Sequence, residues 1–586
     1  MNTRSPPLLL AATMLAAQPA VAMTTEAEVE GLVVQLGAEE FAVREAAAEK
    51  LATLGAAAAD SLMAAAETSP DLEVALRARW LAEAVPITMP HDAPEAAVEL
   101  ARFPDADAET RGRIMHRLLR LDHDAGIEPL ARIVRLERST RGSRSAAALL
   151  AREWRPGDPH WPALGRTILA GLGSGGRPAA RFLRSFVTAT LGGEPAGPAL
   201  DDALAVLAVL EEGREPTVQE GSADPDDDRA PAAAVRIFRR CVIELSSTVG
   251  RRDDALAVAG RLLAACRTGA NADERLAHEL AWLADHGLPE AVDLVDDRLA
   301  EAAPLVIYAA ATCRRARDAR AADELAAVAS KRLADPATDR SLRLQAAILL
   351  SHWGSADWAL AEYQAAADDP ATPPGDLPLA GILHAELLHD RERHAEAAAV
   401  LRRVLDGRDD DDRMGLRLQR DPRTIRSRML YFAACAAAAA GDTAGQRRLL
   451  DEALQASAKD VDALIAAYRL DSGAAPAASR VDRALDALDA DIRSAPDEPD
   501  GYNEYAWLVA NTTGDFAKAL RYARRALDAA ADPDNASYLD TLAHCRAAVG
   551  DLAGAVRTQW LAHRREPHNR TIRRNLDRFR ALQAAP

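Results

Sequence analysis

A spacing of glycine and alanine that recurs along the chain constrains its fold more than any other feature. The stretch GDFAKAL at 514–520 returns thirty-six residues later as GDLAGAV at 550–556. In the second copy Gly550 is followed by Ala555 and Ala562, at offsets of 5 and 12, and the first copy has alanines at the same offsets. Glycine lets the chain turn sharply, alanine lets helices approach closely, and the aspartate after each glycine can cap a helix. The spacing therefore predicts pairs of helices joined by tight turns.

The same spacing occurs upstream and resembles a known repeat family. Gly354 also has alanines at offsets of 5 and 12, and Pro370 and Pro567 stand near the ends of their units. These offsets resemble the tetratricopeptide repeat (TPR), in which helix pairs that cannot cover their own apolar faces stack into an array. The resemblance is specific over 503–569 and weaker before it. It implies a concave groove, lined by the first helix of each pair, that binds a protein or peptide.

Candidate partner-binding residues follow from this resemblance and from the charge of the C-terminal segment. The resemblance implies Asn503, Glu504, Tyr505, Trp507, Asn511, Asp540 and His544, with Tyr505 and Trp507 as either anchors or core residues. The segment 557–580 carries eight arginines against two acids, and RTIRRNLDRFRAL keeps apolar residues on one side. It predicts a basic capping helix, with an anionic partner surface or pairing with the acidic body as alternatives. Arg573 and Arg574 are the candidates for the partner surface.

An earlier pair of segments shows a different repeat. Val43 and Ala47 in FAVREAAAEKLATLG recur as Val74 and Ala78 in LEVALRARWLAE, at a spacing of 31 residues. Each valine begins an apolar helical stripe. The pair resembles HEAT-like repeats over 26–84.

The N-terminal residues have the layout of a secretory signal. Arg4 precedes an apolar run, and a small-residue triplet ends at Ala22. The run is too short to span a bilayer, so we expect cleavage after Ala22, with an uncleaved anchor as the alternative. The expectation is an exported protein, periplasmic or extracellular, with no integral membrane segment after cleavage. An exported chain rich in alanine and arginine with such repeats also resembles repeat proteins of planctomycete-type bacteria.

Composition and repeats together predict the fold class and its divisions. Alanine makes up roughly a quarter of the chain and aromatic residues 4%, which favours helices over strands. The prediction is an all-α protein, an α-solenoid of stacked antiparallel helix pairs, HEAT-like and then TPR-like. Its expected divisions are a signal peptide at 1–22, HEAT-like repeats at 23–210, an acidic flexible linker at 211–231, divergent TPR-like repeats at 232–420, and TPR repeats with the basic capping helix at 421–586.

Three features could indicate chemistry, and each favours a structural interpretation. GLGSGG at 171–176 fits the dinucleotide-loop formula, but a helical segment precedes it where that loop needs a strand, so it predicts a turn before Pro178. His384, His389 and His394 are five residues apart and do not share a helix face as metal ligands would; they predict a polar turn. The five cysteines have no CxxC spacing and predict buried thiols.

The function predicted from these patterns is a non-enzymatic scaffold for a protein or peptide partner, without catalytic residues, cofactor or metal. A net charge of −18 argues against a surface that wraps nucleic acid. Two alternatives remain. A helical-toroid envelope enzyme, a hydrolase or lyase, would bring two carboxylates with raised pKa together in a deep cleft. A structural envelope spacer would have no selective ligand.

Overall fold

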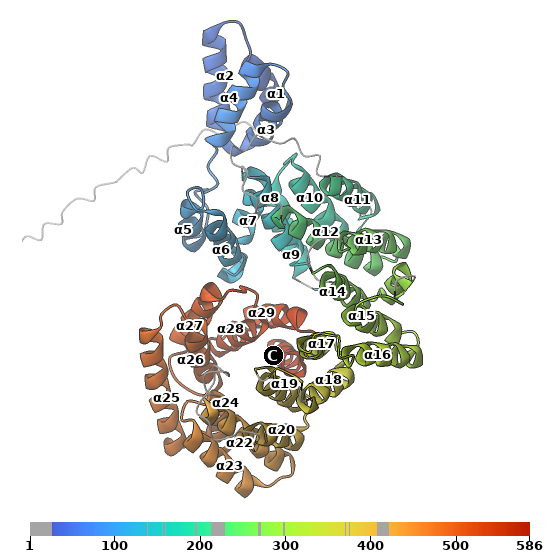
Figure 1. Ribbon diagram of the computed structural model, residues 1–586. Coiled ribbons are helices and arrows are strands. Elements are labelled where there is room, and N and C mark those ends of the chain that lie inside the picture. The colour runs from blue at the N-terminus through green and yellow to red at the C-terminus, as the bar shows by residue number, and fades with distance from the viewer. Residues whose placement is uncertain are drawn as a thin grey trace, which may run out of the picture.

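The fold consists of helices packed in adjacent pairs. The computed structural model describes residues 26–137, 139–154, 156–158, 160–193, 196–212, 229–267, 271–296, 299–369, 371–373, 375–406 and 421–585. Every regular element in these ranges is helical, and most successive helices contact each other along a curved array (Figure 1). This confirms the predicted all-α solenoid. No helix in the same ranges is long and apolar enough to cross a membrane.

Several predicted segments fall outside the described residues. They are the signal peptide at 1–22, most of the linker at 211–231, and the acidic end of the 232–420 division. The proposed divisions of the chain stay predictions.

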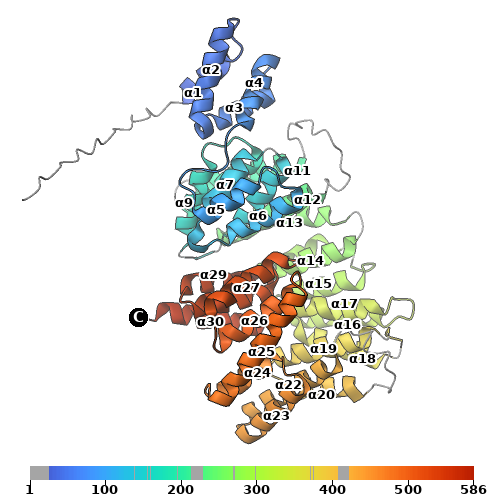
Figure 2. The ribbon, with the colours of Figure 1, turned by 90° about the vertical axis from the view of Figure 1, so that its left-hand side faces the viewer.

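The first four helices form a small unit with its own core, which stands apart at one end of the molecule (Figures 1 and 2). Of the positions in the 31-residue repeat, Ala47, Val74 and Ala78 are buried in this core. The Asp60 carboxylate connects the unit to the following helices, since it accepts the Ser174 hydroxyl at 2.7 Å and pairs with Arg135 at 2.8 Å. The helices are α1 (Glu26–Gln35), α2 (Phe41–Leu54), α3 (Ala59–Thr68) and α4 (Leu72–Glu83).

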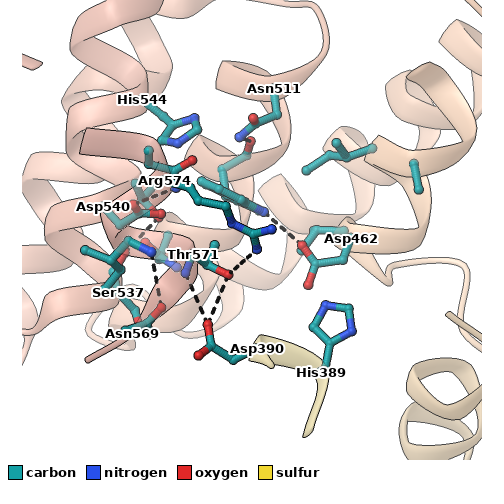
Figure 3. A pocket seen from close by; sticks show the side chains of 18 of the residues that line it. His389, Asp390, Asp462, Asn511, Ser537, Asp540, His544, Asn569, Thr571 and Arg574 are labelled. Carbon is teal, nitrogen blue, oxygen red and sulfur yellow. Dashed lines mark hydrogen bonds between the residues drawn. The ribbon is translucent and has the colours of Figure 1, made fainter. Parts of the chain in front are cut away.

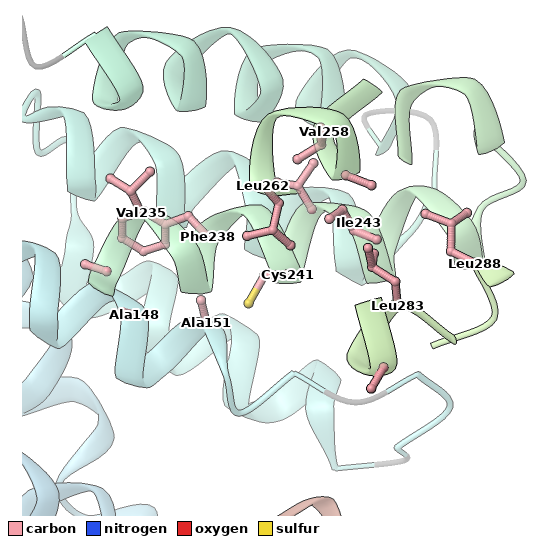
Figure 4. Packing of buried hydrophobic residues seen from close by; sticks show 14 of the residues in the cluster. Ala148, Ala151, Val235, Phe238, Cys241, Ile243, Val258, Leu262, Leu283 and Leu288 are labelled. Carbon is pink, nitrogen blue, oxygen red and sulfur yellow. The ribbon is translucent and has the colours of Figure 1, made fainter. Parts of the chain in front are cut away.

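The next helices share one continuous apolar core. It runs from Ala96 to Ala380, so it extends into the two helices that follow those named below, and it contains Cys241, which packs among leucine, isoleucine and phenylalanine side chains (Figure 4). Burial raises the pKa of Cys241 to about 12, so this thiol acts as a small apolar side chain. The helices are α5 (Pro94–Arg102), α6 (Ala108–Leu119), α7 (Ile127–Leu136), α8 (Thr140–Ala151), α9 (Trp161–Leu172), α10 (Pro178–Leu191), α11 (Ala196–Glu212), α12 (Arg229–Thr248), α13 (Arg252–Ala265), α14 (Ala272–Asp285), α15 (Pro304–Arg315), α16 (Ala319–Leu333) and α17 (Ser341–His352).

The glycine-rich stretch at 171–176 lies in a turn between two helices. α9 ends at Leu172, Gly173 has a positive φ of 52°, and α10 begins at Pro178. The preceding element is a helix, so the predicted turn is confirmed.

The remaining helices form the C-terminal part of the array, and they show the predicted glycine and alanine geometry. Gly550 turns with φ of 89°, and Ala555 and Ala562 are fully buried. Asp551 caps the following helix by accepting the Gly554 N–H at 2.8 Å. The helices are α18 (Ala356–Asp368), α19 (Asp376–Asp390), α20 (His394–Asp406), α22 (Pro422–Ala439), α23 (Thr443–Ala456), α24 (Val461–Leu470), α25 (Ala475–Ser494), α26 (Pro499–Asn511), α27 (Phe516–Ala529), α28 (Ala536–Ala548), α29 (Leu552–Arg565) and α30 (Arg570–Ala584).

The curvature of the array brings α27–α29 back against the helices near α6–α8 (Figures 1 and 2). Arg524 donates to both carboxylate oxygens of Asp122 at 2.7 Å, and Arg546 donates to the Arg120 carbonyl at 3.0 Å. Four arginines of the cationic segment at 557–580 also pair with acids elsewhere in the chain, which was one of the predicted alternatives for that segment. The pairs are Arg557–Asp124, Arg564–Glu244, Arg565–Asp534 and Arg574–Glu392.

Candidate functional site

Every second helix from α19 to α30 contributes side chains to one polar cavity. The cavity has a volume of about 700 Å³ and is lined by residues of α19, α22, α24, α26, α28 and α30 (Figure 3). The intervening helices α20, α23, α25, α27 and α29 contribute none of its lining residues. This alternation is what stacked helix pairs produce, because one helix of each pair faces the inner surface of the array.

The end of α19 meets the start of α30 at the edge of the cavity, where Asp390 lies beside Thr571 (Figure 3). The Asp390 carboxylate accepts the backbone N–H groups of Arg570 at 3.3 Å and Thr571 at 3.1 Å. Arg574 donates to Glu392 at 2.8 Å. A carboxylate at a helix N-terminus accepts hydrogen bonds from free backbone N–H groups, and its negative charge interacts favourably with the helix dipole. Residues 180 positions apart in sequence thus join the two ends of a ring of helices.

An ionic network connects four consecutive inner helices. Arg428 on α22 donates to both oxygens of Glu386 on α19, at 2.8 and 2.9 Å, and also to Asp462 on α24. Asp462 in turn accepts the Trp507 indole N–H from α26 at 3.1 Å. Burial alone would raise the pKa of Asp462, but the Arg428 guanidinium holds it below its usual value. The network fixes these side chains in their inward positions.

Most of the residues predicted from the sequence line this cavity. They are Asn503, Glu504, Trp507, Asn511, Asp540, His544 and Arg574. Tyr505 lies instead in the core, with its ring 4.9 Å from that of Tyr522 and Lys518 Nζ 4.5 Å above it. Arg573 is exposed and is not part of the cavity lining. The role of all nine in binding stays a prediction.

Sequence reasoning missed several lining residues, among them Glu386, Arg428, Asp462, Arg469 and Arg578. One pair could have been predicted to lie together, because Asp462 and Arg469 are seven residues apart and so share a helix face. The sequence does not show, however, whether that face of α24 points into the array. The unit before it has Gln446 where the repeat expects a small residue, so its phase could not be assigned.

Two carboxyl groups of the cavity have raised pKa values, but they differ in their surroundings. Glu504 is accessible to solvent, yet burial by the surrounding walls, together with the Asp500 carboxylate, raises its pKa to about 7. Burial also raises the pKa of Asp540, whose Oδ1 accepts the Asn575 amide at 3.0 Å and that of Gln559. Asp540 is thus held by structural hydrogen bonds.

Replacing Glu504 with glutamine is expected to stabilise the protein at pH 8 and to leave its stability unchanged at pH 4. The pKa of glutamate in an unfolded chain is about 4.3. Between that pH and about 7, the folded protein therefore holds a proton on Glu504 that the unfolded chain has lost. Stability from the neutral form is complete below the unfolded pKa and is lost as the pH rises through the folded pKa. Urea unfolding at both pH values measures the difference. Wild-type and Glu504→Gln profiles that stay parallel would contradict the assignment.

The histidines of the HAELLHDRERH segment lie on both sides of a turn. His384 is buried in α19, His389 is near the end of the same helix, and His394 begins α20. Their polar turn is confined to 391–393, across which His389 Nδ1 and His394 Nδ1 are 3.0 Å apart. In the part of the chain that the structure describes, no group of three or more potential ligands could hold a metal ion.

Comparison with known proteins gives similar chains only among solved structures. No protein-family model matches the sequence, and no curated protein matches it significantly. The APC/C hetero-tetramer Cut9-Hcn1 is similar at 12% identity over 82% of this chain and 92% of that chain, with a TM-score of 0.21. Naa15/Naa10 bound to HypK-THB is similar at 15% identity over 76% of this chain and 66% of that chain, with a TM-score of 0.20. Yeast Tom70 is similar at 12% identity over 83% of this chain and 88% of that chain, with a TM-score of 0.21. These TM-scores are too low to support an argument about the fold. The fold assignment therefore depends on the helix packing of the chain itself.

Proposed function

We propose that this protein is a non-enzymatic scaffold that holds a segment of a protein or peptide partner in the cavity lined by the inner helices of α19–α30. The observation that carries the proposal is the alternation of the lining, in which one helix of each pair presents its side chains inward. Amides, hydroxyls, an indole and charged groups of both signs line the cavity, and such a mixture suits an extended polypeptide better than an apolar ligand. The TPR resemblance implies the same inner surface.

The alternative of an acid–base enzyme has weaker support from the cavity. Its two carboxyl groups with raised pKa, Glu504 and Asp540, lie on different helices, and Asp540 is engaged by Asn575 and Gln559. A pair for acid–base chemistry needs both groups within reach of one substrate. We further propose that the scaffold acts outside the cytoplasm, on the ground of the sequence at 1–22.

Filling the cavity is expected to abolish partner binding without unfolding the protein. Ala466 on α24 lines the cavity, so Ala466→Trp places an indole in the space that the partner segment needs. Ala444→Trp is the matched control, because Ala444 is exposed on the outer helix α23 of the same ring. The measurement is affinity capture from the envelope fraction followed by mass spectrometry. Partners that the wild type and Ala444→Trp retain, and that Ala466→Trp loses, are the expected result; equal capture by all three contradicts the proposal.

A further inference from the structure

Two arginines of the cavity differ from the others in having no acidic partner. Arg428 and Arg574 are both bound to carboxylates. In the described residues no carboxylate lies within ion-pair distance of Arg469 or Arg578. Arg469 donates only to the neutral amide of Asn511, at 2.7 Å, and the Arg578 guanidinium lies 5.9 Å from the centre of the Phe579 ring. Both side chains are exposed to solvent at the cavity, so a ligand that enters it can reach their guanidinium groups.

The two arginines line the same cavity from α24 and α30. Burial lowers the pKa of Arg469, and the positive charge of Arg578 is the next cause. Such repulsion between like charges persists in a fold only at a cost, and a bound anion would remove it. The Asp462 carboxylate partly offsets this effect on the pKa of Arg469, but Asp462 itself is paired with Arg428.

His544 lines the same cavity as these two arginines. Figure 3 shows its imidazole. Its side chain is 5% exposed and lies between two aromatic rings, with centroid distances of 4.7 Å to Trp507 and 5.0 Å to Phe579. Burial, followed by the charges of Arg578 and Arg469, lowers its pKa to about 3, so the imidazole is neutral at pH 7. Its Nε2 atom has no hydrogen-bond partner among the described residues. A buried ring nitrogen without a partner is the kind of group that a ligand satisfies.

We propose that Arg469 and Arg578, beside His544, bind a phosphate monoester dianion. Two permanent positive charges with planar arrays of donors match a group with a charge of about −2 and three acceptor oxygens, whereas one carboxylate neutralises only one of them. The inference rests on the proposed function, because the phosphoryl group then belongs to a side chain of the partner segment in the cavity. Free phosphate carries the same chemistry and is the other source to test.

The test compares ligands of the same size and different charge. The probes are the peptide Ala-Ala-phosphoSer-Ala-Ala, its unphosphorylated form, its glutamate counterpart, and inorganic phosphate, each titrated calorimetrically into the full chain at pH 7.5. We expect the phosphopeptide to bind at least tenfold more tightly than the serine or glutamate peptide. Inorganic phosphate that binds as tightly as the phosphopeptide supports the site with free phosphate as its source. Equal affinity for the glutamate peptide, or no binding of any phosphate probe, overturns it.

Variants locate the binding. Arg469→Gln and Arg578→Gln are each expected to weaken phosphopeptide binding at least tenfold, and neither removes an ion pair of the described fold. Arg580→Gln is the matched control on α30, since Arg580 is exposed and is not part of the lining. Equal loss in all three variants overturns the assignment to this cavity. If no phosphate probe binds but Ala466→Trp still abolishes partner capture, the phosphate inference fails and the proposed function stands.

Discussion

Replacing Asp534 with alanine is expected to lower the free energy of unfolding by about 3 kcal/mol, the cost of removing one partner from a buried ionic cluster. Asp534 lies between α27 and α28 with its side chain 19% exposed, and its carboxylate is 3.1 Å from Arg152, 3.6 Å from Arg120 and paired with Arg565. His116 is 3.8 Å away. Without the carboxylate, three guanidinium groups remain close together. Urea unfolding followed by circular dichroism measures the loss.

A neighbouring acid provides the control for this prediction. Asp532 is also near Arg565, at 3.8 Å, but its side chain is 62% exposed. Asp532→Ala is therefore expected to change stability by less than about 0.5 kcal/mol, as exposed ion pairs usually do. Equal effects at the two positions would show that the buried cluster around Asp534 contributes no special stability.

The pH dependence of the same variant follows from the charges around the carboxylate. Burial alone would raise the pKa of Asp534, but Arg152 and Arg565 hold it well below its usual value. A group whose folded pKa is lowered contributes stability above its unfolded pKa, about 3.9 for aspartate, and loses it as the pH falls towards the folded value. The difference between wild type and Asp534→Ala should therefore be constant from pH 5 to 7 and shrink below about 3.9.

The Asp534 cluster is also one of the contacts that join the two halves of the molecule. Arg120 and Arg152 belong to the N-terminal half, and Asp534 and Arg565 belong to the C-terminal helices. Its contacts therefore hold α27–α29 against the region of α6–α8. Asp534→Ala should also increase the radius of gyration measured by small-angle X-ray scattering, because the remaining arginines repel one another across that interface.

The local parts of this fold could be predicted from the sequence, because short-range geometry determines them. Gly550 has the positive φ that a tight turn needs, and Ala555 and Ala562 are buried where helices approach closely. The closure of the ring could not be predicted. The contact between Asp390 and Thr571 depends on the summed curvature of every unit between them, and no local pattern records that sum.

The residues of the candidate site could be predicted only where the sequence indicates which face of a helix points into the array. Asn503, Trp507 and Asn511 are four residues apart, so one correctly placed residue places the others. Tyr505 lies between them in sequence and faces the core instead. Arg469 and Arg578 were missed because their helices belong to a degenerate unit and to the terminal cap, where the repeat spacing gives no phase.

Replacing Arg428 with methionine is expected to lower the free energy of unfolding by about 3 kcal/mol. Arg428 is 27% exposed and lies between Glu386 and Asp462, so its removal leaves two carboxylates facing each other across the gap between α19 and α24. Its guanidinium also lies 4.9 Å from the centre of the Phe432 ring, and that cation–π contact is lost as well. Arg428→Lys should recover only part of the loss, because lysine cannot bind both oxygens of Glu386 in parallel. Urea unfolding of each variant at pH 7 measures these differences.

Two comparisons separate the charge effect from a simple loss of packing. Arg426→Met, at an exposed position on the same helix, should stay within about 0.5 kcal/mol of wild type. The triple variant Arg428→Met, Glu386→Gln and Asp462→Asn removes all three charges, and the amide at position 462 still accepts the Trp507 N–H. Because an unpaired, partly buried charge costs more than a neutral group of the same shape, the triple variant should be more stable than Arg428→Met alone. If the triple variant is as unstable as Arg428→Met, the loss comes from packing and not from unpaired charge. The Arg428 side chain would then stabilise the cavity lining by the contacts it fills and not by neutralising the two carboxylates.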